Sequence, residues 1–322
     1  MIKKKMSIDI VIVNWNSGGH ARDCIASLAD FPGREGVLER VVVVDNASTD
    51  GSDRGLEHPG IRVEVVRNAR NRGFAAACNQ GARLARADGV LFLNPDTRQI
   101  EDALTACHAF LAAPANARVG IVGVQLLDEA GRLQRSCARF PTPGRVIAQT
   151  VGLDRLLPRL FPPHFLVEWD HGETRPVEQV IGAFLLVRRR LFEELGGFDE
   201  RFFVYYEDVD LCLRARAAGW ETVYFAGARA VHSGGGCSAS AKAHRLFYNL
   251  RSRILFAAKH FPPLGMAGTV AATLLLEPLS RLARALARGA PSEAGQVLVG
   301  TALLWGDLAG LGRKRPPAAG PP

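Results

Sequence analysis

Short apolar runs alternate with helix-like segments through the first third of the chain. The runs carry no regular polar alternation, which is typical of strands buried on both faces of a sheet. Strands that alternate with helices along a sequence indicate a parallel, doubly wound sheet. We therefore expect an α/β fold with a mostly parallel central sheet flanked by helices. The apolar runs are residues 8–13, 41–44, 62–66 and 89–93, and the helix-like segments are residues 18–31 and 74–87.

The middle of the chain is less regular. Residues 135–178 are rich in proline, arginine and aromatic residues and predict a loop-rich segment. The predicted elements on either side are strands at residues 119–126, 179–187 and 222–225 and helices at residues 189–195 and 208–218. Glycine follows both predicted helices, as is common at helix ends.

The C-terminal region has a different character. Residues 245–261 are basic and amphipathic, and residues 264–276 form an uncharged run of thirteen. Such a run is too short to cross a bilayer, which takes roughly 20 apolar residues. Arg281, Arg284 and Arg288 then recur at helical spacing, a pattern typical of a helix lying on a membrane surface.

All of the net charge lies in this region. Residues 242–322 contain eleven Lys or Arg and three Asp or Glu, a balance of +8 that equals the net charge of the whole chain. An anionic membrane surface would suit such a segment, and we expect no nucleic-acid partner. We expect two parts: residues 1–240, and a basic, amphipathic helical extension at residues 241–322 with a flexible tail from about residue 313.

Composition and cysteine usage indicate a cytoplasmic globular protein. With 322 residues and 48% hydrophobic residues the chain can form a substantial core, which excludes a disordered protein. Its six cysteines form no CxxC pair and are expected to be reduced core thiols. The basic start leads directly into residues 8–13, which predict a first strand and not a signal peptide.

Polar residues follow three of the predicted strands. Asn14, Asp45 and Asp96 each lie at a carboxyl end, where open α/β sheets bind their ligands. A carboxylate such as Asp45 can accept hydrogen bonds from a base or a ribose, although an ordinary Asx turn is an equally good interpretation. Asn16 carries the same ambiguity.

Three segments have the composition of a phosphate or metal site. Asn71 and Gly73 precede a predicted helix, whose N-terminus favours anions, or else they only cap it. Asp96, in Asn94-Pro95-Asp96, could bind Mg²⁺ together with phosphate oxygens of a ligand, or cap the next segment. His232 precedes a glycine-rich loop and is either a metal or phosphate ligand or a structural histidine.

The densest signal is a group of acids at the start of a predicted helix. Glu207, Asp208 and Asp210 would stabilise the helix dipole by roughly 0.3–1 kcal/mol each. The aromatic residues just before them would also exclude water, which raises the pKa of a carboxylate towards that of a useful general base. Asp210 and Arg214 have the spacing of a structural ion pair.

Together these motifs resemble the inverting glycosyltransferases of family 2, which have the GT-A fold, and in particular the rhamnosyltransferase-like members. The resemblance extends from about residue 8 to about residue 240, and seven motifs in the expected order make it specific. The motifs are VIVNWNS, VVVVDNASTDGS, NRGFAAACNQG, FLNPDT, GAFLLVRR, GGFDERFFVYYEDVDLCLR and VHSGGG.

The resemblance implies a role for each candidate. Asp208 would be the general base with Glu207 beside it, and Asp96 would stand for the last carboxylate of the metal-binding DxD motif, with Asn94 at its first position. A divalent cation, Mg²⁺ or Mn²⁺, is implied. The implied nucleotide-sugar residues are Asn14, Asn16, Asp45, Asn71, Gly73, Asn94 and Asp96, the implied metal residues are Asp96 and His232, and the acceptor-side residues are Gly182, Ala183 and Tyr206.

The implied reaction is a single displacement that inverts the anomeric centre. A hydroxyl of a glycan or of a polyprenyl-diphosphate-linked acceptor, deprotonated by Asp208, would attack a sugar bound to a nucleoside diphosphate. The extension at residues 241–322 could then hold the enzyme at the inner face of the cell membrane, or it could be an ordinary helical cap.

Other classes of protein fit less well. A Rossmann oxidoreductase needs a G-x-G-x-x-G turn after the first strand, where this chain has Asn-Trp-Asn-Ser-Gly-Gly. A nucleotidyltransferase should carry a glycine-rich basic loop near its N-terminus. The remaining alternative is a noncatalytic module that binds a nucleotide sugar, which the acidic pair at Glu207 and Asp208 argues against.

Overall fold

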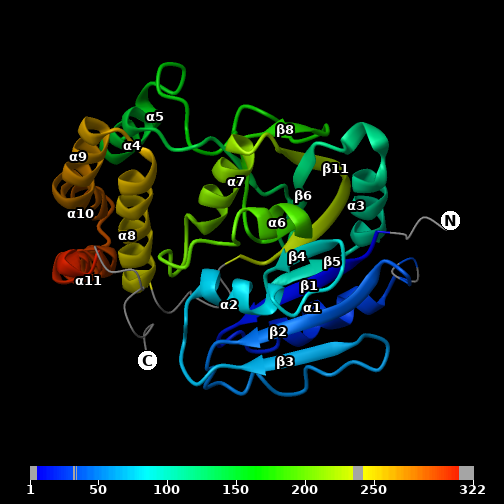
Figure 1. Ribbon diagram of the computed structural model, residues 1–322. Helices are drawn as coiled ribbons and strands as arrows, with labels where there is room; N and C mark the ends of the chain where they lie inside the picture. Colours follow the sequence, from blue (N-terminus) through cyan, green and yellow to red (C-terminus); the bar gives the residue numbers. More distant parts are fainter. Residues whose placement is uncertain (1–5, 32, 34, 235–241, 312–322) are drawn as a thin grey trace.

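A mixed β-sheet forms the centre of the computed structural model of this protein (Figure 1). The structure describes residues 6–31, 33, 35–234 and 242–311. The strand order is β3-β2-β1-β4-β10-β6-β11-β5, with β8 paired to β11. The strands are β1 (Ile8–Asn14), β2 (Leu38–Asp45), β3 (Val63–Arg67), β4 (Gly89–Leu93), β5 (Thr97–Gln99), β6 (Val119–Leu127), β7 (Cys137–Ala138), β8 (Arg175–Val177), β9 (Gln179–Val180), β10 (Phe184–Arg188) and β11 (Glu221–His232).

The helices connect and flank these strands. They are α1 (His20–Ala29), α2 (Phe74–Ala82), α3 (Ala103–Ala112), α4 (Pro143–Val151), α5 (Leu153–Leu156), α6 (Arg189–Glu194), α7 (Glu207–Ala217), α8 (Lys242–His260), α9 (Pro263–Ala271), α10 (Glu277–Ala287) and α11 (Pro291–Gly306). A π-helical segment, Ala272–Leu276, joins α9 to α10. The predicted α/β fold with flanking helices is confirmed.

The first four strands of the sheet are parallel to one another. Beyond them the sheet is mixed, because β10 is antiparallel to both β4 and β6, whereas β11 runs parallel to β6. Asn14 at the end of β1 pairs in register with Asp45 at the end of β2. The parallel register therefore brings polar residues from neighbouring strands to one edge of the sheet.

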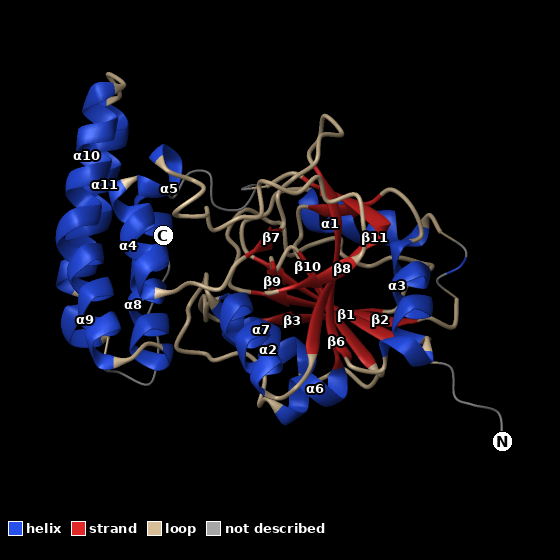
Figure 2. Ribbon diagram, turned by 90° about the horizontal axis from the view of Figure 1, so that it is seen from above, coloured by secondary structure: helices blue, strands red, loops and turns tan. Residues whose placement is uncertain are grey.

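Helices cover both faces of the sheet (Figure 2). Successive strand residues point to opposite faces. In β1, Val11 packs in the layer that contains α2, α6 and α7, whereas Ile10 and Ile12 pack in the layer that contains α1 and α3. Burying such a side chain contributes roughly 1.5–3 kcal/mol. Two covered faces explain why the strands show no polar alternation.

The helices α4, α5 and α8–α11 form a group to one side of the sheet (Figures 1 and 2). The basic, amphipathic segment at residues 245–261 lies almost entirely in α8, which ends at His260. Its buried side chains Phe247 and Ile254 pack with Phe203, which lies in the loop just before α7. The helical group therefore contacts the segment that leads into the predicted catalytic helix.

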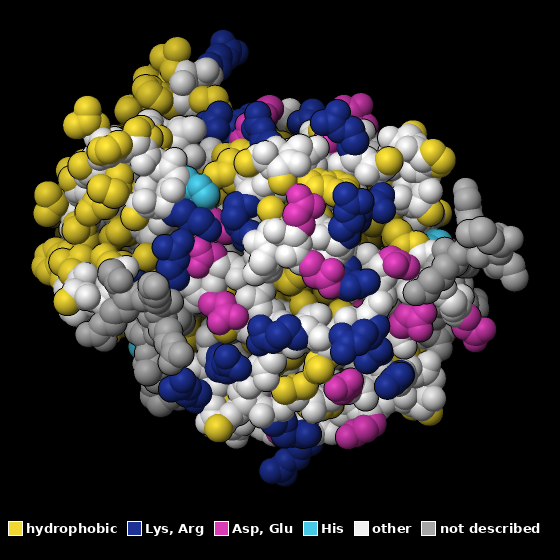
Figure 3. Space-filling model, in the orientation of Figure 1, with side chains coloured by type: hydrophobic (Ala, Val, Ile, Leu, Met, Phe, Trp, Pro, Cys, Tyr) yellow, Lys and Arg dark blue, Asp and Glu magenta, His cyan; other side chains and the backbone are white. Residues whose placement is uncertain are grey.

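Many large apolar side chains are exposed on the helices α9, α10 and α11 and on the segment between α9 and α10. They appear as the yellow cluster on the left of Figure 3. We call this surface the apolar face. Its residues are Leu264, Leu275, Leu276, Leu279, Leu286, Leu298, Val299, Leu303 and Trp305.

None of the helices in the described part of the chain has the length and apolar character needed to cross a membrane.

One predicted strand was wrong. Residues 179–187 form two strands, because β9 pairs with β7 whereas β10 pairs with β4 and β6. The strand is interrupted around Gly182, whose N–H donates to Asp208 Oδ2 at 3.1 Å instead of to a neighbouring strand. The interruption brings this backbone segment to the start of α7.

The segment predicted to be loop-rich, residues 135–178, contains the helix α4. The signals for this helix are present in the sequence. Thr142 Oγ1 accepts the N–H of Arg145 at 3.3 Å, Pro143 occupies the first helical position, and Gly152 ends the helix with a φ of 80°. These are the residue types preferred at helix ends, so the proline and arginine content of the segment was misleading.

The helix predicted at residues 74–87 ends earlier, at Ala82. The buried carboxylate of Asp9, in β1, accepts the backbone N–H of Ala87 at 2.9 Å. Because that N–H is held at the sheet, it cannot take part in a helix.

The cysteines in the described part of the chain are free and buried: Cys24, Cys78, Cys107, Cys137 and Cys212. Burial raises the pKa of each of these thiols, which keeps them protonated. Cys237 and the tail predicted from about residue 313 lie outside the described residues.

Candidate active site

A cavity of about 770 Å³ opens where the parallel strands end. Ten of the residues predicted from the sequence line it, although they come from widely separated parts of the chain. Asp96 and Asp208 thus share one cleft, as a common active site requires. The ten residues are Asn71, Gly73, Asn94, Asp96, Gly182, Ala183, Tyr206, Glu207, Asp208 and His232.

Asn14, Asn16 and Asp45 do not line the cavity. Asn14 Nδ2 donates to Asp45 Oδ1 at 2.8 Å, and Ser48 Oγ donates to the same oxygen at 2.6 Å. Asn16 Oδ1 accepts the N–H of Thr49 at 2.7 Å. In this conformation the three residues hold the turn that follows β2 in place. Their direct contact with a nucleotide stays a prediction.

Asn46, which the sequence analysis did not single out, lines the cavity at this strand end. Its Nδ2 donates to the carbonyl oxygen of Gly73 at 3.1 Å, and Asn71 Oδ1 accepts the N–H of Gly73 at 2.9 Å. The next N–H, of Phe74, donates to the carbonyl oxygen of Phe203 at 2.6 Å. The strand end, the start of α2 and the loop before α7 are therefore linked by backbone contacts.

Asp96 and His232 lie side by side because β5 pairs with the end of β11. The His232 Nε2 atom is 3.4 Å from Asp96 Oδ1, and its Nδ1 is 3.0 Å from Gln134 Oε1. A carboxylate and an imidazole in this arrangement fit a divalent cation that takes its other ligands from a diphosphate. In the described residues, no cluster of three or more His, Cys, Asp or Glu side chains forms a complete metal site.

Glu207 and Asp208 begin α7 and both face the cavity. Asp208 accepts two backbone N–H groups, from Gly182 at 3.1 Å and from Val209 at 2.8 Å. Burial raises the pKa of Asp208 above its ordinary value, although these hydrogen bonds oppose the rise.

The environment of Glu207 is less polar. Burial, and then the charge of Asp208, raises the pKa of Glu207 well above its ordinary value. Its Oε2 atom accepts no hydrogen bond from the described residues. A negative charge shared between the two carboxylates is therefore better stabilised on Asp208, which leaves Asp208 able to accept a proton.

An unusual backbone turn presents this pair to the cavity. Tyr205 and Tyr206 have φ angles of 67° and 69°, in the left-handed region that non-glycine residues rarely adopt. Each such residue costs on the order of 1–3 kcal/mol and persists only where its surroundings hold it. Arg253 of α8 provides one of these contacts through a hydrogen bond to Tyr206.

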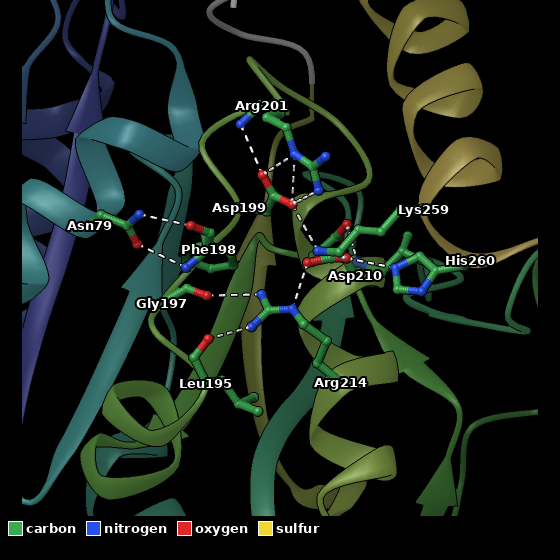
Figure 4. Close-up of polar contacts among 12 residues, drawn as sticks. Asn79, Leu195, Gly197, Phe198, Asp199, Arg201, Asp210, Arg214, Lys259 and His260 are labelled. Carbon is green, nitrogen blue, oxygen red and sulfur yellow. Dashed lines mark hydrogen bonds and ion pairs between the residues drawn. The ribbon is translucent and has the colours of Figure 1, made fainter. Parts of the chain in front are cut away.

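A buried ionic cluster holds α7 in place (Figure 4). The fully buried carboxylate of Asp210 lies 2.7 Å from Arg214 Nε, 2.6 Å from Lys259 Nζ and 2.7 Å from His260 Nε2. Burial opposes ionisation of this carboxyl, but the contacts with His260, Arg214 and Lys259 lower its pKa overall. The predicted pair of Asp210 and Arg214 is confirmed, and α8 contributes the other two partners, Lys259 and His260.

The match to known families covers most of this site. Residues 9–196 match the model described as Glycosyl transferase family 2, which is more than half of the chain. The chain belongs to glycosyl transferase family 2. Residues 161–287 also match the model described as Glycosyl transferase family group 2. The family 2 assignment establishes that the protein is a glycosyltransferase, as the motifs predicted.

Relatives within the family include rhamnosyltransferases. The chain is 30% identical over 241 residues, 70% of its own length and 75% of the relative's, to the N-acetylglucosaminyl-diphospho-decaprenol L-rhamnosyltransferase of Mycobacterium tuberculosis. It is 31% identical over 153 residues, 47% of its length and 54% of the relative's, to the rhamnosyltransferase WbbL of Escherichia coli. The prediction of a rhamnosyltransferase-like family member is confirmed.

Solved structures of glycosyltransferases share the fold. A mannosyltransferase from Pyrobaculum calidifontis, in complex with GDP-Man and Mn²⁺, superposes with a TM-score of 0.57 at 18% identity, over 95% of this chain and 89% of that one. Residues 1–349 of TarS from S. aureus, in complex with UDP-GlcNAc, give a TM-score of 0.51 at 16% identity, over 95% of this chain and 92% of that one. At these identities the likeness concerns the fold alone.

Proposed function

We propose that this glycosyltransferase moves a rhamnose-like or other hexose from a nucleoside-diphosphate sugar to a hydroxyl group of a glycan or lipid-linked acceptor, with inversion. The main support is the cavity, which brings Asp96 and His232 together with Glu207 and Asp208. Asp96 and His232 suit a metal ion bound to a diphosphate, and the carboxylates of Glu207 and Asp208 suit proton transfer. Relatives named as rhamnosyltransferases support the choice of sugar.

Asp208 is the proposed general base. It removes the proton of the acceptor hydroxyl, the new bond forms at the anomeric carbon, and the bond to the nucleoside diphosphate breaks with its electron pair on the departing oxygen. One displacement of this kind inverts the anomeric centre. Asp208 ends the step protonated, and the hydrogen bond from Gly182 holds its carboxylate in position before the step.

Asp96 and His232 are the proposed protein ligands of Mg²⁺ or Mn²⁺. Such an ion, when bound, neutralises charge on the leaving diphosphate. Asn71, Gly73 and Asn94 line the same part of the cavity and are assigned to the nucleotide sugar, with Asn14, Asn16 and Asp45 supporting the turn after β2. Gly182, Ala183 and Tyr206 are assigned to the acceptor side. These assignments are proposals for site-directed tests.

A lipid-linked acceptor would place the enzyme at a membrane. We propose that residues 1–240 form the catalytic part and residues 241–322 a basic helical extension that contacts an anionic membrane from the cytoplasmic side. The apolar face and the arginines of α10 support this arrangement, because an interfacial helix needs both kinds of side chain. No nucleic-acid partner is proposed.

The first test is Asp208→Asn. This change keeps the size of the side chain and removes its ability to take a proton, so transfer should fall by at least about a hundredfold. Binding of the sugar nucleotide, measured by thermal shift with Mg²⁺ or Mn²⁺, should stay within about twofold. The donor is first chosen by screening sugar nucleotides in the same assay. Normal turnover in Asp208→Asn would remove Asp208 as the base.

A matched control tests whether the effect depends on the position of the carboxylate in the cavity. Asp154 also lines the cavity, on α5, and Asp154→Asn makes the same chemical change away from α7. Its transfer rate should stay within a few fold of wild type. If the wild-type chain binds sugar nucleotides and gives no transfer to any hydroxyl acceptor, the noncatalytic module is the better description.

A further inference from the structure

The cavity continues beyond the residues assigned to the donor and the base. Besides Asp96, Glu207 and Asp208, its wall includes six arginines from four helices and two further acids, Asp154 and Glu277. Sequence analysis did not bring these arginines together, because they are far apart along the chain. We call them the arginine wall: Arg145, Arg155, Arg245, Arg253, Arg281 and Arg284.

Part of the arginine wall is neutralised within the protein. Glu277, at the start of α10, is buried and lies 2.7 Å from both Arg253 Nη1 and Arg281 Nη2. Burial opposes ionisation of Glu277, but Arg253 and Arg281 lower its pKa to about 2. One carboxylate thus serves two guanidinium groups, and a positive charge remains.

Arg145 lies 3.8 Å from Glu178, whereas two other arginines of the wall have no acidic partner in the described residues. Arg155 and Arg284 form no ion pair with any described side chain, and the buried Nε of Arg253 has no hydrogen-bond partner there. Burial, and next the charges of Arg155 and Arg281, lower the pKa of Arg284. Guanidinium groups that repel one another around an open cavity favour the binding of an anion.

The positive charge of the arginine wall also affects a nearby histidine, His164. His164 also lines the cavity. Burial is the main reason that the pKa of His164 falls to about 4, and the charges of Arg253 and Arg145 lower it further. His164 therefore stays neutral at physiological pH, and the arginines supply the positive charge for an anion in this part of the cavity.

The arginine wall lies between the catalytic pair and the apolar face. Arg253 contacts Tyr206, which precedes the pair, whereas Arg281 and Arg284 share α10 with Leu279 and Leu286 of the apolar face. A molecule with a sugar, a diphosphate and a prenyl chain in that order would match the three surfaces in the same order.

We propose that Arg155, Arg281 and Arg284 bind the diphosphate of a polyprenyl-diphosphate-linked acceptor. Arg253 supports them from behind through Glu277. Guanidinium groups suit this ligand because they pair with two phosphate oxygens at once. The inference rests on the proposed function for the sugar end of the acceptor, and it adds the residues that recognise the diphosphate.

The test measures binding of farnesyl diphosphate to the full chain by titration calorimetry. Arg155→Ala together with Arg284→Ala should weaken binding at least tenfold. These two side chains form no internal ion pair in the described structure, so the variant should keep the melting temperature of the wild type within a few degrees. Unchanged affinity for farnesyl diphosphate would overturn the proposal.

Arg288→Ala is the matched control. Arg288 lies just after α10, and its side chain is 60% exposed. Among the described residues, it is not one of those that line the cavity. The change removes one arginine charge from the same region, where the double variant removes two, and affinity for farnesyl diphosphate should stay within about twofold. A loss equal to that of the double variant would show only a general charge effect and would overturn the proposal.

A second arm distinguishes the acceptor diphosphate from that of the donor. Affinities for UDP and dTDP are measured for the same variants, and both should stay within about twofold of wild type. An equal loss of nucleotide affinity would assign the arginines to the donor and overturn the proposal. Arginine-dependent farnesyl diphosphate binding without transfer from any sugar nucleotide would contradict the proposed function and leave this inference standing.

Discussion

At the scale of single residues, the site depends on a few backbone positions that ordinary side chains could not occupy. Gly73 has a φ of 86°, and a Cβ atom there would lie 2.6 Å from the carbonyl oxygen of Phe203. Contacts this short do not occur between such atoms, so the loop before α7 would have to move. The close approach of two backbone segments is the physical reason for glycine at this position.

We predict that Gly73→Ala destabilises the protein and weakens donor binding. A positive φ combined with a ψ of 164° lies in a backbone region open almost only to glycine, which costs a residue with a Cβ atom about 1–3 kcal/mol, and the contact with Phe203 adds to this cost. Urea unfolding gives the stability, and thermal shift with the chosen sugar nucleotide gives the binding. Gly131→Ala is the control, because Gly131 has a φ of 74° with no atom within 4 Å of the added carbon. An equal loss in both variants would mean that the contact with Phe203 is unimportant.

At the scale of secondary-structure elements, α7 is held from two sides. The loop before it contacts α2 through Phe203, and Asp210 within it contacts Lys259 and His260 of α8 (Figure 4). Lys259 also reaches Asp199, at 2.8 Å. Since Asp210 lies two residues after Asp208, these contacts fix the direction in which the proposed base points.

We predict that Asp210→Asn lowers the free energy of unfolding by about 3 kcal/mol, because it leaves Arg214 and Lys259, which are half-buried, without their buried carboxylate. The matched control is Glu193→Gln, which breaks an i,i+4 ion pair with Arg189 on α6 where the glutamate is 61% exposed. An exposed pair of this kind contributes about 1 kcal/mol or less. Urea unfolding measures both, and similar effects would show that the Asp210 cluster does not hold α7.

The ion pairs of Glu277 predict that the stability of the junction between α8 and α10 depends on pH. The pKa of Glu277 is lowered from 4.5 to about 2 in the folded protein. A lowered carboxyl pKa stabilises the fold above the unfolded value, and that stabilisation is lost as the pH falls from about 4.5 towards 2. The stability difference between wild type and Glu277→Gln should therefore shrink between pH 7 and pH 3.5.

Urea unfolding at the two pH values measures this difference. Glu293→Gln is the control, since the Glu293 side chain is 56% exposed and lies 4.0 Å from Arg288. Its effect should be small and nearly independent of pH. A Glu277→Gln effect that stays constant with pH would contradict the ion-pair explanation.

At the scale of the whole molecule, catalytic residues, arginines and apolar side chains form three neighbouring surfaces. The first comes from the sheet and α7, the second from α4, α5, α8 and α10, and the third from α9–α11. Exposed apolar patches of this extent mark interaction surfaces in soluble folds. The arrangement suits an enzyme that works on a substrate anchored in a lipid surface.

We predict that the full chain floats with anionic vesicles and that Leu279→Ser with Leu286→Ser reduces this binding more than tenfold. The two leucines are 65% and 71% exposed on α10, and burying each in lipid contributes roughly 1.5–3 kcal/mol. Ile100→Ser is the control, because Ile100 is 43% exposed beside β5, outside the apolar face. Failure of the wild type to float, or an equal loss with Ile100→Ser, would contradict a membrane role for this face.

Much of this organisation could be predicted because it depends on local patterns. Apolar runs indicated the strands around Val11 and Val43 without knowledge of their neighbours in the fold, because strands buried on both faces have such runs. The end of the strand predicted at residues 89–93 indicated where Asp96 would lie, and the aromatic and acidic composition indicated the helix that begins at Glu207.

Long-range contacts decided the rest. The interruption at Gly182 depends on Asp208, 26 residues later, and the position of Gly73 depends on Phe203. The arginine wall exists only because four helices from distant segments meet at one cavity. The sequence by itself determined most of the elements and the family, because those follow from neighbouring residues, whereas the break between β9 and β10 did not. Only the tertiary structure decided which side chains face the cavity and which, like Asp45, support the turn after β2, because that depends on partners far along the chain.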